Sequence, residues 1–159
     1  NHNIYMNKIN YMDLALKHAK KALIYNEVPI GALIVNESNN KILSLQHNKN
    51  LVNNSPINHA EILAIEEACN NLNSRYLNNT SIYVTLEPCL MCLAAISEAR
   101  ISKLYFGAYD NKKGATNDIN NYFYKKNYYI PEIYGGINEM KCGKILTNFF
   151  TNLRKKNAR

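Results

Sequence analysis

Two short motifs contain the residues best suited to chemistry, H-A-E at residues 59–61 and P-C-L-M-C at residues 88–92. His59, Cys89 and Cys92 offer one imidazole and two thiolates, which makes three zinc ligands and not four. A structural zinc site completes its tetrahedron with protein side chains, whereas a catalytic site leaves the fourth position to water. Glu61 is a carboxylate beside this set, and a carboxylate next to a metal-bound water can transfer protons. Together the motifs predict a zinc site that adds water to a substrate.

The local sequence favours this interpretation over simpler ones for each motif. A lone C-x-x-C can be a redox pair or half of a structural zinc knuckle, and a lone His-x-Glu often has no function. Here a β-rich run at residues 81–86 precedes Pro88, whose fixed φ suits the first turn of a helix. Two cysteines three residues apart on that helix face one side, and a helix N-terminus stabilises thiolates. The apolar periodicity of residues 62–69 predicts that His59 and Glu61 open a second helix.

Length and composition restrict the class of protein. The 159 residues contain no linker-like tract, so we expect one domain over residues 1–159, long enough to bury a core. Residues 1–8 are expected to be a flexible or non-native N-terminal extension, with Met6 as a natural start, and residues 151–159 the basic end of a helix. We expect no membrane span and no secretory signal, because no long apolar run is present. Cys69 and Cys142 fit small apolar positions of a reduced, cytoplasmic protein.

Hydrophobic periodicity predicts alternating helices and strands. Helices are expected over residues 11–25 (capped by Asn10), 59–71, 89–99 and 139–154. Strands are expected over residues 30–35, 42–45, 81–86 and 103–106, with a weaker strand near 132–134 after a polar loop. This alternation is typical of a layered α/β fold in which helices cover a mixed sheet.

Charge is distributed unevenly along the chain. Residues 1–100 carry eight Lys/Arg and eight Asp/Glu, whereas residues 101–159 carry eleven and four, together with seven of the twelve tyrosines. Cations neutralise phosphates and aromatic rings stack on unpaired bases, which suits a single-stranded or looped nucleic acid. For any single residue, a solvated helix end or a core tyrosine is the simpler interpretation. The segregation as a whole favours RNA, through residues 122–129 and the basic end at residues 154–159.

The chain resembles the bacterial tRNA-specific adenosine deaminases, which convert the wobble adenosine of an anticodon to inosine. H-x-E with P-C-x-x-C is the pattern of the wider zinc nucleobase deaminases, the cytidine and deoxycytidylate deaminase superfamily. The narrower resemblance is carried by E-V-P-I-G-A at 27–32, H-N-K at 47–49, Y-V-T-L-E-P-C at 83–89, F-G-A-Y-D-N-K-K-G-A at 106–115 and N-F-F at 148–150. It implies a three-layer, cytidine-deaminase-like α/β fold, with a mixed central sheet of about five strands and helices on both faces.

The resemblance also implies roles for individual residues. His59, Cys89 and Cys92 would bind one Zn²⁺ per subunit, and Glu61 would shuttle protons while zinc-activated water attacks C6 of adenosine 34. Substrate contacts are implied for Asn48, Ala60, Val28, Pro29, Ile30, Asp110 and Lys112. Tyr109 stands where the family often has arginine, so a ring that can stack or hydrogen-bond replaces a phosphate contact. The implied partners are a tRNA anticodon stem-loop and a second copy of the chain in a homodimer.

Three alternatives remain open at this point. A related zinc deaminase could act on free guanine or cytosine, although a free base has no phosphate for the basic segment to neutralise. A non-enzymatic RNA-binding module with a structural zinc would need a fourth protein ligand, which neither motif offers. A catalytically inactive deaminase fold serving as a partner subunit would not need Glu61.

Overall fold

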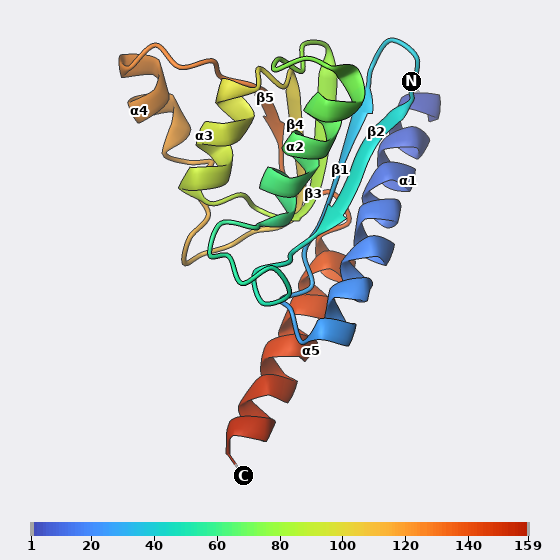
Figure 1. Ribbon diagram of the computed structural model, residues 1–159, viewed down its shortest axis with the longest axis vertical. Coiled ribbons are helices and arrows are strands. Elements are labelled where there is room, and N and C mark those ends of the chain that lie inside the picture. Colours follow the sequence, from blue (N-terminus) through green and yellow to red (C-terminus); the bar gives the residue numbers. More distant parts are fainter. Residues whose placement is uncertain (1, 159) are drawn as a thin grey trace.

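A five-stranded mixed sheet forms the middle layer of the protein (Figure 1). The computed structural model describes residues 2–158, with side chains described from residue 11 onward. The strands are β1 (Gly31–Asn36), β2 (Ile42–His47), β3 (Thr80–Leu86), β4 (Lys103–Ala108) and β5 (Glu132–Tyr134), in the order β2-β1-β3-β4-β5. Strand β1 pairs antiparallel with β2 and β3, whereas β3, β4 and β5 run parallel.

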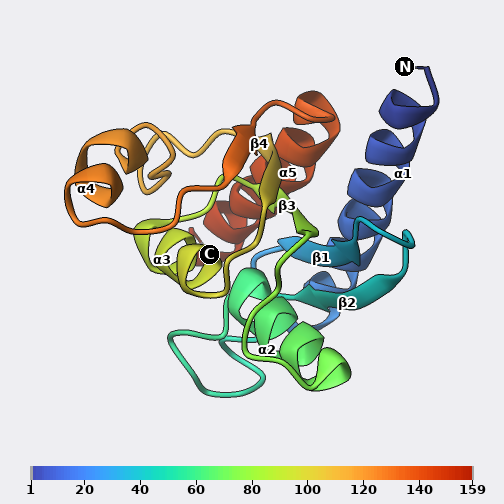
Figure 2. The same ribbon diagram turned by 90° about the horizontal axis from the view of Figure 1, so that it is seen from above.

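Helices cover both faces of this sheet, as the view from above shows (Figure 2). One face carries α2 (Ala60–Leu72) and α3 (Leu90–Glu98), and the other carries α1 (His2–Ala19) and α5 (Glu139–Asn157). A 3₁₀ helix, η1 (Lys20–Tyr25), continues α1, and α4 (Ile119–Lys125) lies beside α3. Among the described residues, no helix is both long and apolar enough to cross a bilayer. The predicted α/β arrangement with helices on both faces of a mixed sheet is confirmed.

Strand alternation divides the apolar core into two clusters, one on each face of the sheet. In β1, Ala32 and Ile34 pack toward α2 and α3, while Leu33 and Val35 pack toward α1 and α5. Successive residues of a strand point to opposite faces, so a strand buried on both sides is apolar at every position. This explains why the middle of each of the strands β1, β3 and β4 is apolar at successive positions, at residues 32–35, 82–84 and 104–106.

Helix α1 approaches β1 closely at Gly31. A Cβ atom at Gly31 would lie 2.0 Å from the backbone oxygen of Ala15, and the Gly31 N–H donates to Thr85 Oγ1 at 3.1 Å. Only glycine allows this approach of two backbones. The contact sets α1 directly against the strand that leads from the expected pocket wall at residues 28–30.

The structure differs from the predicted elements in three respects. The first helix begins at His2, before the predicted cap at Asn10, and its predicted end at residues 20–25 is a 3₁₀ helix. Helix α4 lies within the segment predicted to be a polar loop. It was not predicted because only Ile119 and Phe123 of its seven residues are buried, and so short a segment shows little hydrophobic periodicity. Other boundaries differ by a few residues, as element ends often do. Residues 1 and 159, at the ends of the expected N-terminal extension and basic segment, lie outside the described residues.

Candidate functional site

The three candidate zinc ligands lie at the starts of α2 and α3. His59 and Cys89 are the N-cap residues of these helices, and both have extended backbones, with φ/ψ of −65°/151° and −73°/172°. Cys92 follows in the first turn of α3, where Leu93 N donates to Cys89 O at 2.9 Å. The two helix starts bring the ligand atoms of His59, Cys89 and Cys92 within 4.8 Å of one another, as a shared metal site requires. Pro88 lies before the cap and not in the first turn, because Cys89 keeps the extended conformation of an N-cap.

The distances between the ligand atoms fit a tetrahedral zinc ion. His59 Nδ1 lies 3.4 Å from Cys92 Sγ and 3.7 Å from Cys89 Sγ. Zn–N bonds of 2.0–2.1 Å and Zn–S bonds of 2.3 Å at tetrahedral angles place nitrogen and sulfur about 3.6 Å apart. Within the described part of the chain, these residues are the one group of three His, Cys, Asp or Glu side chains close enough for a metal. His59 Nδ1 and the two sulfurs therefore form a candidate zinc site.

The two thiols are electrostatically different. A hydrogen bond from Cys92, assisted by one from His59, lowers the pKa of Cys89 to about 4. The pKa of Cys92 is raised, because its proton is held in the hydrogen bond to Cys89 and its sulfur is buried. The hydrogen bond with Cys89 raises the pKa of His59. These hydrogen bonds favour the thiolate form of Cys89, and zinc binding requires both cysteines to be deprotonated.

Glu61 lies in the first turn of α2, directly beside this ligand set. Its side chain is buried, with 4% exposed, and its carboxyl group interacts with the Cys92 thiol. Burial raises the pKa of Glu61, while the interaction with Cys92 opposes that shift. A carboxyl group with a raised pKa is suited to accept and return a proton near neutral pH.

Asn48 connects the end of β2 to the start of α2. Its Oδ1 accepts a hydrogen bond from Ala60 N at 2.8 Å, which satisfies one of the unpaired N–H groups at the start of that helix. Asn48 N donates to Ile30 O at 3.1 Å, and Asn48 is only 6% exposed. The structure therefore brings Asn48, Ala60 and Ile30 together beside His59. Because Oδ1 is engaged, the amide nitrogen of Asn48 is the group oriented away from the helix.

Two buried carboxylates, neither of them predicted from the sequence to have a role, hold the loops that follow β2 and β4. Glu27 accepts hydrogen bonds from Leu51 N and Val52 N, in the loop after β2. Glu87 accepts from the loop that follows β4. Each acid lies inside a motif that carries the family resemblance, Glu27 at the start of residues 27–32 and Glu87 within residues 83–89, and an acid beside an apolar strand was the available signal.

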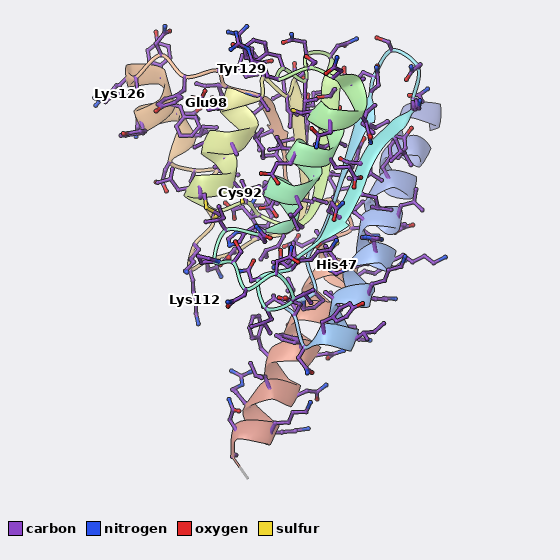
Figure 3. The ribbon with its side chains drawn as sticks, viewed as in Figure 1. His47, Cys92, Glu98, Lys112, Lys126 and Tyr129 are labelled. Atoms are coloured by element: carbon purple, nitrogen blue, oxygen red, sulfur yellow. The ribbon has the colours of Figure 1, made fainter. Side chains whose placement is uncertain are left out.

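The loop after β4 carries Asp110 and Lys112. Asp110 Oδ1 accepts from Lys112 N at 3.0 Å and from Lys113 N at 3.1 Å, so this carboxylate shapes the loop itself. Lys112 is exposed and lies on the side of the molecule where α2 and α3 begin (Figure 3). Tyr109 packs edge-on against Phe106, with ring centroids 5.0 Å apart, and stays 52% exposed.

A groove of about 620 Å³ joins this loop to the C-terminal half of α5. Its lining includes Val28 from the expected pocket wall, Tyr109 and Lys112 from the loop, and Phe150 and Arg154 from α5. Pro29, between Val28 and Ile30, is buried. The groove therefore brings basic residues from two distant parts of the chain to the expected pocket wall.

The other basic and aromatic segment, residues 122–129, lies elsewhere. Ser97 Oγ, near the C-terminal end of α3, donates to Tyr129 O at 2.6 Å. Lys126 and Tyr129 accordingly lie at the end of α3 opposite to Cys92 (Figure 3). The charge segregation seen in the sequence is thus divided in space: the loop after β4 and the end of α5 line the groove, and residues 122–129 do not.

Comparisons with known proteins agree with this geometry. Residues 6–108 match the cytidine and deoxycytidylate deaminase zinc-binding region. The chain is 46% identical over 144 residues to a tRNA-specific adenosine deaminase of Rickettsia felis, covering 90% of this chain and 100% of the relative. It is 42% identical over 147 residues to that of Bacillus subtilis, covering 92% and 90%.

The fold has a counterpart among solved structures. A structure from a study of A-to-I editing by tRNA:A34 deaminases superposes with a TM-score of 0.80 at 40% identity, covering 86% of this chain and 99% of that one. This match confirms the expected cytidine-deaminase-like fold. The chain belongs to the cytidine and deoxycytidylate deaminase family with its zinc-binding region, and within that family to the tRNA-specific adenosine deaminases.

Proposed function

We propose that this protein hydrolyses the wobble adenosine, adenosine 34, of a tRNA anticodon loop to inosine and ammonia. The observation that carries the proposal is the three-ligand site with Glu61 buried beside it. His59 Nδ1 lies 3.4 and 3.7 Å from the two sulfurs, which fits a zinc ion with one position left for water. The names of the relatives support adenosine in tRNA as the substrate.

The reaction replaces an amino group by oxygen at C6 of adenine. Zinc, when bound, lowers the pKa of water to about 7 and so supplies a nucleophile at neutral pH. Glu61 removes the proton of the attacking water and passes protons to the purine ring and to the leaving amino group. A C6–O bond forms, the C6–N bond breaks and ammonia leaves. Burial of Glu61 supports this role, since it raises the pKa of the carboxyl group and so favours its holding a proton.

Residues around the ligand set position the base. Asn48 Oδ1 and the Ala60 N–H are already bonded to each other. The amide nitrogen of Asn48 therefore donates to an acceptor on the purine, while the backbone of Ala60 packs against the edge of the base. Val28, Pro29 and Ile30 form the apolar wall. Asp110 and Lys112 hold the RNA backbone, with Asp110 acting mainly through the turn that it stabilises.

The substrate is an anticodon stem-loop, whose bases are already partly unstacked. Extruding a base costs less from a loop than from a duplex. Lys112 and Arg154 line one groove together with Val28 of the expected pocket wall, and two cations in this groove support contacts to the phosphates of the RNA.

The working form is a homodimer in the cytoplasm. Large apolar side chains are exposed in the loop after β2, at Leu51, Val52 and Ile57, and at Leu90, the first residue of α3, which supports a covered surface there. The four cysteines are free thiols, as expected in a reducing compartment. Light scattering tests the dimer, and a monomer at micromolar concentration would contradict it.

The decisive experiment compares substrates and one isosteric variant. Zinc-loaded protein is incubated with an anticodon stem-loop carrying adenosine 34 and, separately, with free guanine and cytosine, and inosine and ammonia are measured. We expect inosine only from the RNA. Glu61→Gln should keep one zinc per chain and lose about 10²–10⁴-fold in kcat. Ammonia from a free base, or full turnover by Glu61→Gln, would refute the proposal.

A further inference from the structure

Glu87 is a buried carboxylate without a cationic partner. It directly follows β3, precedes Pro88 and Cys89, and is 7% exposed. Where side chains are described, the ion pair within 4 Å joins Glu37 to Lys103, so the partners of Glu87 are neutral donors. A buried charge is costly unless hydrogen bonds replace its hydration. The hydrogen bonds of Glu87 are therefore informative about its role.

All three side-chain hydrogen bonds of Glu87 go to one loop, residues 109–116. Asp110 N donates to Oε1 at 3.1 Å. Thr116 N and Thr116 Oγ1 both donate to Oε2, at 3.1 and 2.6 Å. The two carboxylate oxygens thus hold the two ends of the loop, through bonds that a charged acceptor makes stronger than neutral ones.

The loop folds tightly around this carboxyl group. A Cβ atom at Gly114 would lie 2.3 Å from Glu87 Cδ and 2.5 Å from Asp110 O. Gly114 N donates to Asp110 O at 2.9 Å, and Ala115 N donates to Pro88 O at 3.1 Å. The last bond ties the loop to the residue before the zinc ligand Cys89. Glu87 therefore links the loop and the metal-binding turn into one unit.

This loop contributes an aromatic and a basic side chain to the groove between the loop and α5. Tyr109 and Lys112 line it, whereas the hydrogen bonds of Glu87 go to Asp110 and Thr116. Without the carboxylate, the loop would lose the bonds at both of its ends and would have to be ordered by the RNA, which costs binding free energy.

We propose that Glu87 is a positioning residue that preorganises the loop at residues 109–116 for the RNA substrate. This inference rests on the proposed function, since the substrate gives the loop its purpose. Its signature is a higher KM with little change in kcat, because the loop binds the RNA backbone and Glu61 performs the proton transfer.

The test uses Glu87→Gln, which keeps the size of the side chain. The amide has one acceptor oxygen, so its NH₂ group must face at least one N–H donor of the loop. We expect KM for the anticodon stem-loop to rise about tenfold and kcat to change less than about threefold. Zinc content should stay at one per chain. Glu37→Gln is the matched control, since Glu37 bonds Ser81 at the other end of β3, and it should leave KM unchanged.

Thr116 supplies a second pair of variants in case Glu87→Gln folds poorly. Thr116→Val keeps the shape but removes the donor of the 2.6 Å bond, and it should raise KM about threefold. Thr116→Ser keeps the hydroxyl group and should restore a KM near that of the unaltered protein. Loss of zinc, or a lower kcat at unchanged KM, would assign these residues to metal binding or general stability and overturn the proposal.

Amide hydrogen exchange separates this inference from the proposed function. In the zinc-loaded protein, the amides of Asp110 and Thr116 should exchange slowly, and in Glu87→Gln they should exchange at least about tenfold faster. Equal exchange in both proteins would overturn the positioning role. A protein that makes no inosine at all would refute the proposed function, while the exchange measurement would still decide whether Glu87 orders the loop.

Discussion

Replacing Asn48 by alanine should affect stability and activity by separate routes. Asn48 Oδ1 accepts the hydrogen bond of Ala60 N at 2.8 Å, and both residues are buried. Removing the acceptor leaves a buried N–H unpaired, which costs about 1–3 kcal/mol, and the loss of a helix cap alone costs about 0.5–2 kcal/mol. We therefore expect the free energy of unfolding to fall by about 2 kcal/mol. For a chain of this length, the melting temperature should fall by roughly 4–8 °C.

The same substitution removes the amide donor proposed to contact the base. An unpaired polar group on a buried substrate costs about 1–3 kcal/mol, so kcat/KM should fall by roughly 5- to 150-fold. Urea unfolding and inosine formation are measured on the same zinc-loaded samples. Asn53→Ala is the control from the same loop, because its exposed 2.7 Å bond to Asn58 should be worth less than about 0.5 kcal/mol. Equal unfolding midpoints for the two variants would refute the reasoning.

Two further predictions concern stability. Burial, together with the facing Lys21, His47 and Lys49, lowers the pKa of His18 from 6.5 to about 4, whereas Glu67 opposes the shift. His18 is neutral in both states above pH 6.5, and between pH 6.5 and 4 only the unfolded chain gains its proton, so the protein should lose stability as the pH falls through this range. The full pKa shift would be worth about 3 kcal/mol, and solvent screening of this half-buried ring reduces it to about 1 kcal/mol. Urea unfolding at pH 7.5 and pH 5 measures the loss of unfolding free energy, which should be smaller in His18→Asn than in the unaltered protein. Gly31→Ala should cost about 3 kcal/mol or more, because the new Cβ would lie 2.0 Å from Ala15 O and both partners are backbone; an unchanged urea midpoint would contradict this close approach.

Much of the fold was predictable because its signals are local. The three successive apolar residues at 82–84 of strand β3 indicate burial on both faces, which the two core clusters confirm. Helix α4 was not predictable, since its seven residues bury only Ile119 and Phe123. Its place beside α3 depends on tertiary contacts such as the bond from Ser97 to Tyr129, which no local pattern encodes.

The sequence by itself determined the zinc chemistry of this protein. The spacing of His59, Cys89 and Cys92 at two helix starts depends on helix geometry, which is local, and the count of three ligands already indicated a catalytic site. Tertiary structure alone decided which basic residues lie beside that site. In the folded chain Arg154 lies in the same groove as Lys112, whereas residues 122–129 lie near the C-terminal end of α3. Tertiary structure also decided what holds the loops, because the hydrogen bonds of Glu27 and Glu87 join residues more than twenty positions apart and depend on how the strands are paired.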